Sequence, residues 1–164
     1  MQKIVYSILS IFLIINIIGC VGYEPIFSSS ELNLKVVEHS IEGDKKLGKK
    51  IYSQLNRTFN SKNNSSDSKD VIILIKTEKD ISPTVKNSAG EIVEYRVQIK
   101  TNLLMKDSSN NKELINFDIN LSSSYKVQDQ YFETKKIEAK TLDELLNKTI
   151  QDLLIKISEN SLSS

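Results

Sequence analysis

The residue of this chain best suited to covalent chemistry is Cys20, its only cysteine. It follows Ile17-Ile18-Gly19, and this tetrapeptide fits the bacterial lipobox, in which a signal peptidase cuts before a cysteine that then carries lipid on its sulfur and nitrogen. The motif predicts that Cys20 is a lipid anchor and not a disulfide partner, redox sensor or nucleophile. Several acyl chains on one residue make a durable tether, because each buried methylene contributes about 0.8 kcal/mol.

The first nineteen residues have the pattern of a secretory signal peptide. Lys3 is their only charge, an apolar run from Ile4 to Ile18 follows, and a small glycine precedes the cysteine. A transmembrane anchor is the alternative, but a span needs about 20 apolar residues, and this run is shorter and lacks a basic flank. We therefore expect a lipoprotein signal peptide at 1–19, a lipidated N-terminus and leash at 20–30, and one domain at 31–160.

The charge balance limits the class of partner. The chain has 22 basic and 21 acidic residues, a net charge of +1, and removing residues 1–19 takes away one lysine and no acid, which leaves 0. A nucleic-acid-binding protein needs a surplus of clustered lysine and arginine, so no nucleic acid is expected as partner.

The residue after the cysteine bears on localisation. Val21, and not an aspartate, follows Cys20, which resembles the sorting signal for the outer membrane. We therefore expect a lipid-anchored protein on the periplasmic side of that membrane.

The sequence offers little for catalysis. His39 is the only histidine, so neither a multi-histidine zinc site nor a cysteine dyad is expected. No Gly-x-Ser-x-Gly turn presents a serine, and no glycine-rich loop is suited to phosphate. The tight acidic pair Asp143-Glu144 is explained by helix capping. We expect no enzymatic activity, no metal and no cofactor.

The first elements of the domain follow from hydrophobic periodicity. Apolar residues alternate from Leu32 to Val36, which predicts a strand, with His39 in an edge strand or loop. Asp44 is placed to cap a helix over 45–59, in which apolar residues recur every fourth position: Leu47, Ile51, Leu55 and Phe59. Residues 60–70 are polar and predict a loop.

The next segments predict three strands. The continuous apolar run "VIILIK" at 71–76 favours a central strand covered on both faces. Residues 94–105 and 115–125, on either side of the turn 107–112, have mostly apolar odd positions, and their even positions are polar as far as Asn102 and again from Asn116. Such a hairpin has one apolar and one polar face, and because the helices must cover the apolar face, the polar face is left bare.

A second helix is predicted from Thr141, where "TLDE" has the form of a capping box. Apolar residues continue at three- and four-residue steps to Ile157. This stripe is typical of a core helix, with a partner-binding surface or a coiled-coil seam as alternatives. The order strand, helix, three strands, helix predicts an α+β fold, a two-layer sandwich with two helices on one face of a four-stranded mixed sheet.

The lipobox cysteine begins the segment "CVGYEPIF" at 20–27. With this segment and its order of motifs the chain resembles the lipopolysaccharide-assembly lipoproteins of the LptE family, which often have Cys-Gly-Tyr/Trp-x-Pro/Leu here, so that Val21 is an insertion. The resemblance continues through "SPTVKNSAGEIVEYRVQIKTNLLM" at 82–105 and the terminal amphipathic helix. It covers essentially the whole chain after the signal peptide and implies the same two-layer fold.

The resemblance also implies a role. Family members fill the lumen of the outer-membrane barrel LptD, help it fold, and contact lipopolysaccharide during export. The polar strand face would then meet the barrel, through Arg96, Gln98, Lys100, Asn102, Asn116 and Asn120. Basic family positions that meet lipopolysaccharide match Lys86 and either Lys135 or Lys136. The alternative function is that of a lipoprotein subunit in a periplasmic lipid-transport or efflux system.

Overall fold

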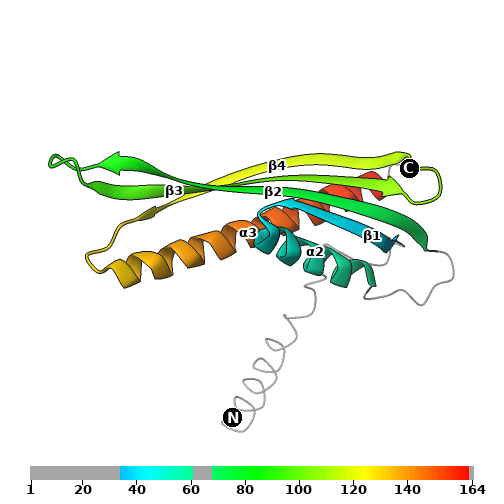
Figure 1. Ribbon diagram of the computed structural model, residues 1–164, viewed down its shortest axis with the longest axis horizontal. Helices are drawn as coiled ribbons and strands as arrows, with labels where there is room; N and C mark the ends of the chain where they lie inside the picture. The colour runs from blue at the N-terminus through cyan, green and yellow to red at the C-terminus, as the bar shows by residue number, and fades with distance from the viewer. Residues whose placement is uncertain (1–33, 61–67, 163–164) are drawn as a thin grey trace, which may run out of the picture.

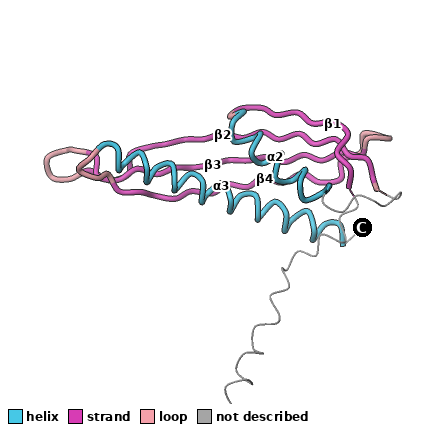
Figure 2. The backbone as a smooth tube through the Cα atoms, turned by 90° about the horizontal axis from the view of Figure 1, so that it is seen from below, coloured by secondary structure: helices cyan, strands magenta, loops and turns pink. Residues whose placement is uncertain are grey.

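The computed structural model describes residues 34–60 and 68–162, in which two helices cover one face of a four-stranded sheet (Figures 1 and 2). The sheet order is β1-β2-β3-β4, with β1 parallel to β2 and the other pairs antiparallel. This confirms the predicted α+β sandwich. The elements are β1 Leu34–Gly43, α2 Lys45–Asn60, β2 Lys69–Lys86, β3 Ile92–Asp107, β4 Glu113–Lys126 and α3 Tyr131–Leu162.

Several predictions fall wholly or partly on residues that the structure does not describe. The signal peptide at 1–19, the lipidated Cys20 and the leash at 20–30 lie outside the described residues, as does 61–67 of the predicted loop. The start of the first predicted strand, at Leu32, lies outside them as well, and the described strand continues past Val36 to Gly43. Within the described part of the chain, no helix is long and apolar enough to cross a membrane.

The helix α2 begins and packs as the sequence predicts. The carboxylate of Asp44 accepts hydrogen bonds from the backbone N–H groups of Lys46 and Leu47, both at 3.1 Å, which satisfies two donors of the first turn. The buried side of the helix carries Leu47, Ile51, Leu55 and Phe59. The turn into the helix uses Gly43 at φ +77°, in the left-handed region that favours glycine.

The strand β2 corrects one prediction. Val71, Ile73 and Ile75 are buried against the helices, whereas Ile72 and Leu74 are only partly buried on the opposite face. The expectation of cover on both faces is wrong, because both helices lie on the same side of the sheet (Figure 2). On the open side Leu74 instead lies beside Leu104, its partner on the neighbouring strand β3, which is also only partly buried.

The hairpin of β3 and β4 confirms the predicted alternation. The odd residues Val97, Ile99, Leu103 and Met105 of β3 are buried, and on β4 Ile115, Ile119 and Tyr125 are buried with Phe117 and Leu121 partly so. The even residues are exposed or intermediate. One face of this hairpin therefore belongs to the core and the other is open.

The helix α3 begins ten residues before the predicted start. Thr141 is 8% exposed inside the helix and caps nothing, although the apolar stripe through Leu153 and Ile157 is buried as expected. Residues 131–140 contain neither proline nor glycine, so the helix extends through them without a break. Its first turn is instead fastened by Thr134, whose hydroxyl accepts a hydrogen bond from the backbone N–H of Gln128 at 2.8 Å.

Candidate functional site

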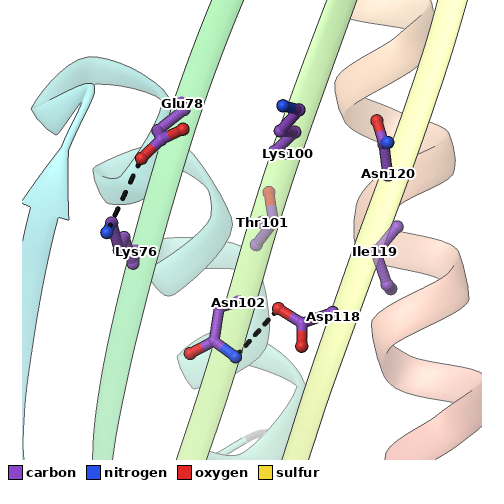
Figure 3. Close-up of a pocket in the computed structure, with 8 residues that line it drawn as sticks. All are labelled: Lys76, Glu78, Lys100, Thr101, Asn102, Asp118, Ile119 and Asn120. Atoms are coloured by element: carbon purple, nitrogen blue, oxygen red, sulfur yellow. Dashed lines mark hydrogen bonds and ion pairs between the residues drawn. The ribbon is translucent and has the colours of Figure 1, made fainter.

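The open face of the sheet carries parallel rows of polar side chains from β2, β3 and β4. Because antiparallel register places paired residues on the same face, Lys76 lies beside Asn102 and Asn102 beside Asp118. The next row is Glu78, Lys100 and Asn120 (Figure 3). We call this surface the open sheet face; it comprises Lys76, Glu78, Arg96, Gln98, Lys100, Asn102, Asn116, Asp118 and Asn120.

Hydrogen bonds between neighbouring strands order this face. The amide of Gln98 donates to the side-chain oxygen of Asn120 at 2.8 Å. The amide of Asn102 donates to Asn116 at 3.0 Å and to the carboxylate of Asp118 at 3.1 Å. These bonds hold the amide and carboxylate groups in fixed positions while leaving them accessible to a partner.

The centre of the open sheet face is a shallow hollow of about 410 Å³. Figure 3 shows the residues that line it, with Lys76 bound to Glu78 at 3.6 Å on one side and Asn102 bound to Asp118 on the other. Ammonium, carboxylate and amide groups are therefore close together. Such a surface offers hydrogen-bond donors and acceptors as well as charges of both signs. It therefore suits contact with a polar protein surface better than recognition of a single charged group.

The structure places all six residues named for barrel contact on the open sheet face. Those on β3 are Arg96, Gln98, Lys100 and Asn102, and those on β4 are Asn116 and Asn120. Sequence reasoning missed Lys76 and Glu78, because β2 was expected to be covered on both sides. The alternation of these two residues with the buried Ile75 and Thr77 is the signal that identifies them.

The three lysines named for lipid contact lie at one end of the molecule. Lys86 is exposed at the end of β2, beside the tip of the β2–β3 hairpin, while Lys135 and Lys136 are exposed in the second turn of α3. Lys135 and Lys136 were expected before the last helix, and the early start of α3 places them inside it. Lys86 was expected in the turn before the long strand and is the last residue of β2. The hairpin tip and the start of α3 lie at the same end of the molecule, away from β1 (Figures 1 and 2).

The two helical lysines differ in their surroundings. Lys135 forms an ion pair with Glu138 at 2.8 Å, and this hydrogen bond raises the pKa of the lysine and lowers that of the carboxyl. Glu138 also accepts a hydrogen bond from the hydroxyl of Tyr125 at 2.8 Å, and burial raises the pKa of that tyrosine. Among the described residues, Lys136 forms no ion pair. Lys136 is therefore better placed than Lys135 to meet an external anion.

The described residues contain no group of three or more histidine, cysteine, aspartate or glutamate side chains that could hold a metal ion. His39 lies in the edge strand β1 and stacks on Tyr52 of α2, with ring centroids 3.8 Å apart. Its ring therefore packs β1 against the helix.

No family model matches the chain, and no curated protein matches its sequence. Among solved structures, rare lipoprotein B from Shewanella oneidensis is similar with a TM-score of 0.56 at 13% identity, over 77% of this chain and 97% of that one. Lipoprotein B from Nitrosomonas europaea is similar with a TM-score of 0.56 at 19% identity, over 77% and 86% of the two chains. At these identities the likeness concerns the fold, and the chain has the fold of these lipoproteins.

Proposed function

We propose that this protein is an outer-membrane lipoprotein that fills the lumen of an LptD-type barrel, assists the assembly of that barrel, and helps lipopolysaccharide to insert into the membrane. The lipobox at Cys20 supports the anchor, and the fold shared with lipoproteins supports the class. In this function the protein binds partners and carries out no enzymatic reaction.

The observation that carries the proposal is the open sheet face. An ordinary surface position would explain any one of its polar residues, but three long strands present amide and charged groups in register over one uncovered face. The lumen of a transmembrane barrel is lined by polar side chains, because outward-facing and inward-facing residues alternate along its strands. A plug in this lumen needs a broad polar surface, and the open sheet face provides it.

Recovery of a barrel with the tagged full-length chain from its native envelope tests the proposal. We expect an LptD-type barrel to co-purify with the wild-type chain, and we expect Lys100→Glu combined with Asn102→Asp to reduce its recovery. Lys148→Glu, an exposed change of the same sign on α3, is the matched control and should leave recovery unchanged. Recovery of a transporter of the inner membrane in place of a barrel would favour the transport-system alternative and overturn the proposal.

A further inference from the structure

The first turn of α3 exposes two aromatic rings. Tyr131 is 76% exposed and Phe132 is 74% exposed, far more than the other exposed large apolar residues. Val85, 44% exposed, pairs with Glu94 near the end of β2, and Val127, 37% exposed, bonds to Val93 just before α3, so both lie at this end of the sheet. Apolar side chains that gather on a surface commonly mark a binding site.

These rings are presented by an ordered scaffold. The backbone N–H of Val127 donates to the carbonyl of Val93 at 2.9 Å, which ties the segment before α3 to β3. Thr134, 8% exposed, bonds to the backbone of Gln128, and the ammonium of Lys135 lies 5.8 Å from the centre of the Tyr131 ring. The exposure of the rings therefore belongs to the folded structure, because a frayed helix end would lack these contacts.

Charges at the same end of the molecule indicate the chemistry of the partner. Within the part of the chain that the structure describes, the exposed ammonium groups of Lys86, Lys126 and Lys136 form no ion pair. Asp129 and Glu133 lie in the same segment, so this end is not uniformly basic. A partner with anionic groups at a few positions and apolar chains beside them fits this surface better than a simple polyanion does.

We infer that Tyr131 and Phe132 bind the acyl chains of a lipopolysaccharide next to its phosphates, which meet Lys86 and Lys136. This inference rests on the proposed function and assigns the apolar part of the contact. Aromatic rings lie well at the boundary between lipid chains and head groups, and a lysine beside them reaches a phosphate as a point charge. The aromatic rings therefore contribute affinity only when the lipid has its acyl chains. The lysines contribute affinity that falls as the salt concentration rises.

Binding of two probes to the full-length chain in mild detergent separates these contributions. The probes are lipopolysaccharide and the same lipopolysaccharide with its acyl chains removed. For Tyr131→Ser combined with Phe132→Ser, we expect a loss of about tenfold in affinity for the intact probe, as expected when about 1.4 kcal/mol is lost, and little change for the deacylated probe. Lys86→Glu combined with Lys136→Glu should weaken binding of both probes.

Ile155→Ser is the matched control, because this residue is an exposed apolar position near the other end of the same helix, at 38%. It should leave both affinities unchanged, and thermal unfolding of each variant checks that the fold is kept. Equal binding of the intact probe by the aromatic variant and the wild-type chain would overturn the inference while leaving the proposed function in place. Loss of barrel recovery without loss of lipid binding would assign the rings to the barrel and also overturn it. Failure of the wild-type chain to bind lipopolysaccharide would overturn both the inference and the lipid role.

Discussion

The two faces of the sheet are built from the same strands, because successive residues of each strand point to opposite faces. One face stabilises the fold, and the other is accessible for contact with a partner. On the covered face Val97 and Ile99 are fully buried, while Gln98 and Lys100 between and beside them remain accessible on the open face. The covered face is stabilised by removal of apolar surface from water, whereas the open face is ordered by side-chain hydrogen bonds that contribute little net stability. Substitutions on the open face can therefore change binding without unfolding the domain.

The largest expected effect comes from placing a charge on the covered face. Val97→Asp buries a carboxylate without a partner, because Val97 is 0% exposed, and should lower the free energy of unfolding by about 4 kcal/mol or more. Gln98→Asp, on the adjacent residue, loses one exposed hydrogen bond and should cost about 1 kcal/mol or less. Urea unfolding of both variants measures the difference. Similar losses from the two changes would show that the face assignment is wrong.

A smaller effect is expected where Gly48 of α2 packs against Ile41 of β1. A Cβ atom on Gly48 would overlap the Cγ2 methyl of Ile41 on β1, so Gly48→Ala should push the helix away from the strand. We expect a loss of about 1–3 kcal/mol from overpacking, in spite of the better helix propensity of alanine. Gly48→Ala in an Ile41→Ala background is the control, since alanine lacks the Cγ2 methyl and the glycine change should cost less there than in the wild-type chain in thermal unfolding. A stabilised single variant would mean that the helix and strand are more loosely packed.

The alternation that predicted the two faces explains why the sequence was most informative for β3 and β4. In a strand, successive side chains point to opposite faces, so an alternation of apolar and polar residues indicates which positions are buried. The amino-acid sequence alone therefore assigns Gln98 and Asn120 to the open sheet face. For β2 the apolar run at 71–76 hid the same period, because Ile72 and Leu74 are apolar residues on the open side. Lys76 and Glu78 were missed for this reason.

Helix boundaries were less predictable, because a capping motif is local and helix extension depends on the whole segment. Thr141 has the sequence of a cap but lies inside α3, and the actual first turn depends on a contact between Thr134 and the preceding loop. The exposed pair Tyr131-Phe132 could not be recognised from the sequence either. Adjacent aromatic residues give no period, and only the fold shows that both are left uncovered.

Two hydroxyl groups on the covered face should lower stability by about 1 kcal/mol each. Thr77 and Thr101 are cross-strand neighbours, at 0% and 2% exposure, and among the described residues their hydroxyls have no hydrogen-bond partner. Because an unsatisfied buried hydroxyl is costly, Thr77→Val and Thr101→Val should each raise the free energy of unfolding by about 1 kcal/mol.

Thr149→Val is the control for these two changes. Thr149 is equally buried at 0%, but its hydroxyl donates to the carbonyl of Leu145 at 2.9 Å. Its replacement should therefore give no gain in thermal unfolding. A gain from all three variants would mean that valine improves packing in general and that the missing hydrogen bonds are not the cause.

The smallest expected effect lies in the turn between β3 and β4, where hydrogen bonds and an ion pair hold the side chain of Asp107. The carboxylate of Asp107 accepts hydrogen bonds from the hydroxyl of Ser109 at 2.6 Å and from its backbone N–H at 2.8 Å, and it pairs with Lys69 at 3.3 Å. These bonds, with the Ser109 hydroxyl first, lower the pKa of Asp107 to about 2. In the unfolded chain the pKa of an ordinary aspartate is higher, about 3.9. The ionised Asp107 therefore stabilises the folded state above about pH 4, and this stabilisation is lost as the pH falls through about 2.

Carboxyl titration by NMR should show that Ser109→Ala raises the pKa of Asp107, with a smaller rise for Lys69→Met. A larger rise from the lysine change would make the ion pair the main cause and would place the stability of this turn under the control of salt as well as acid.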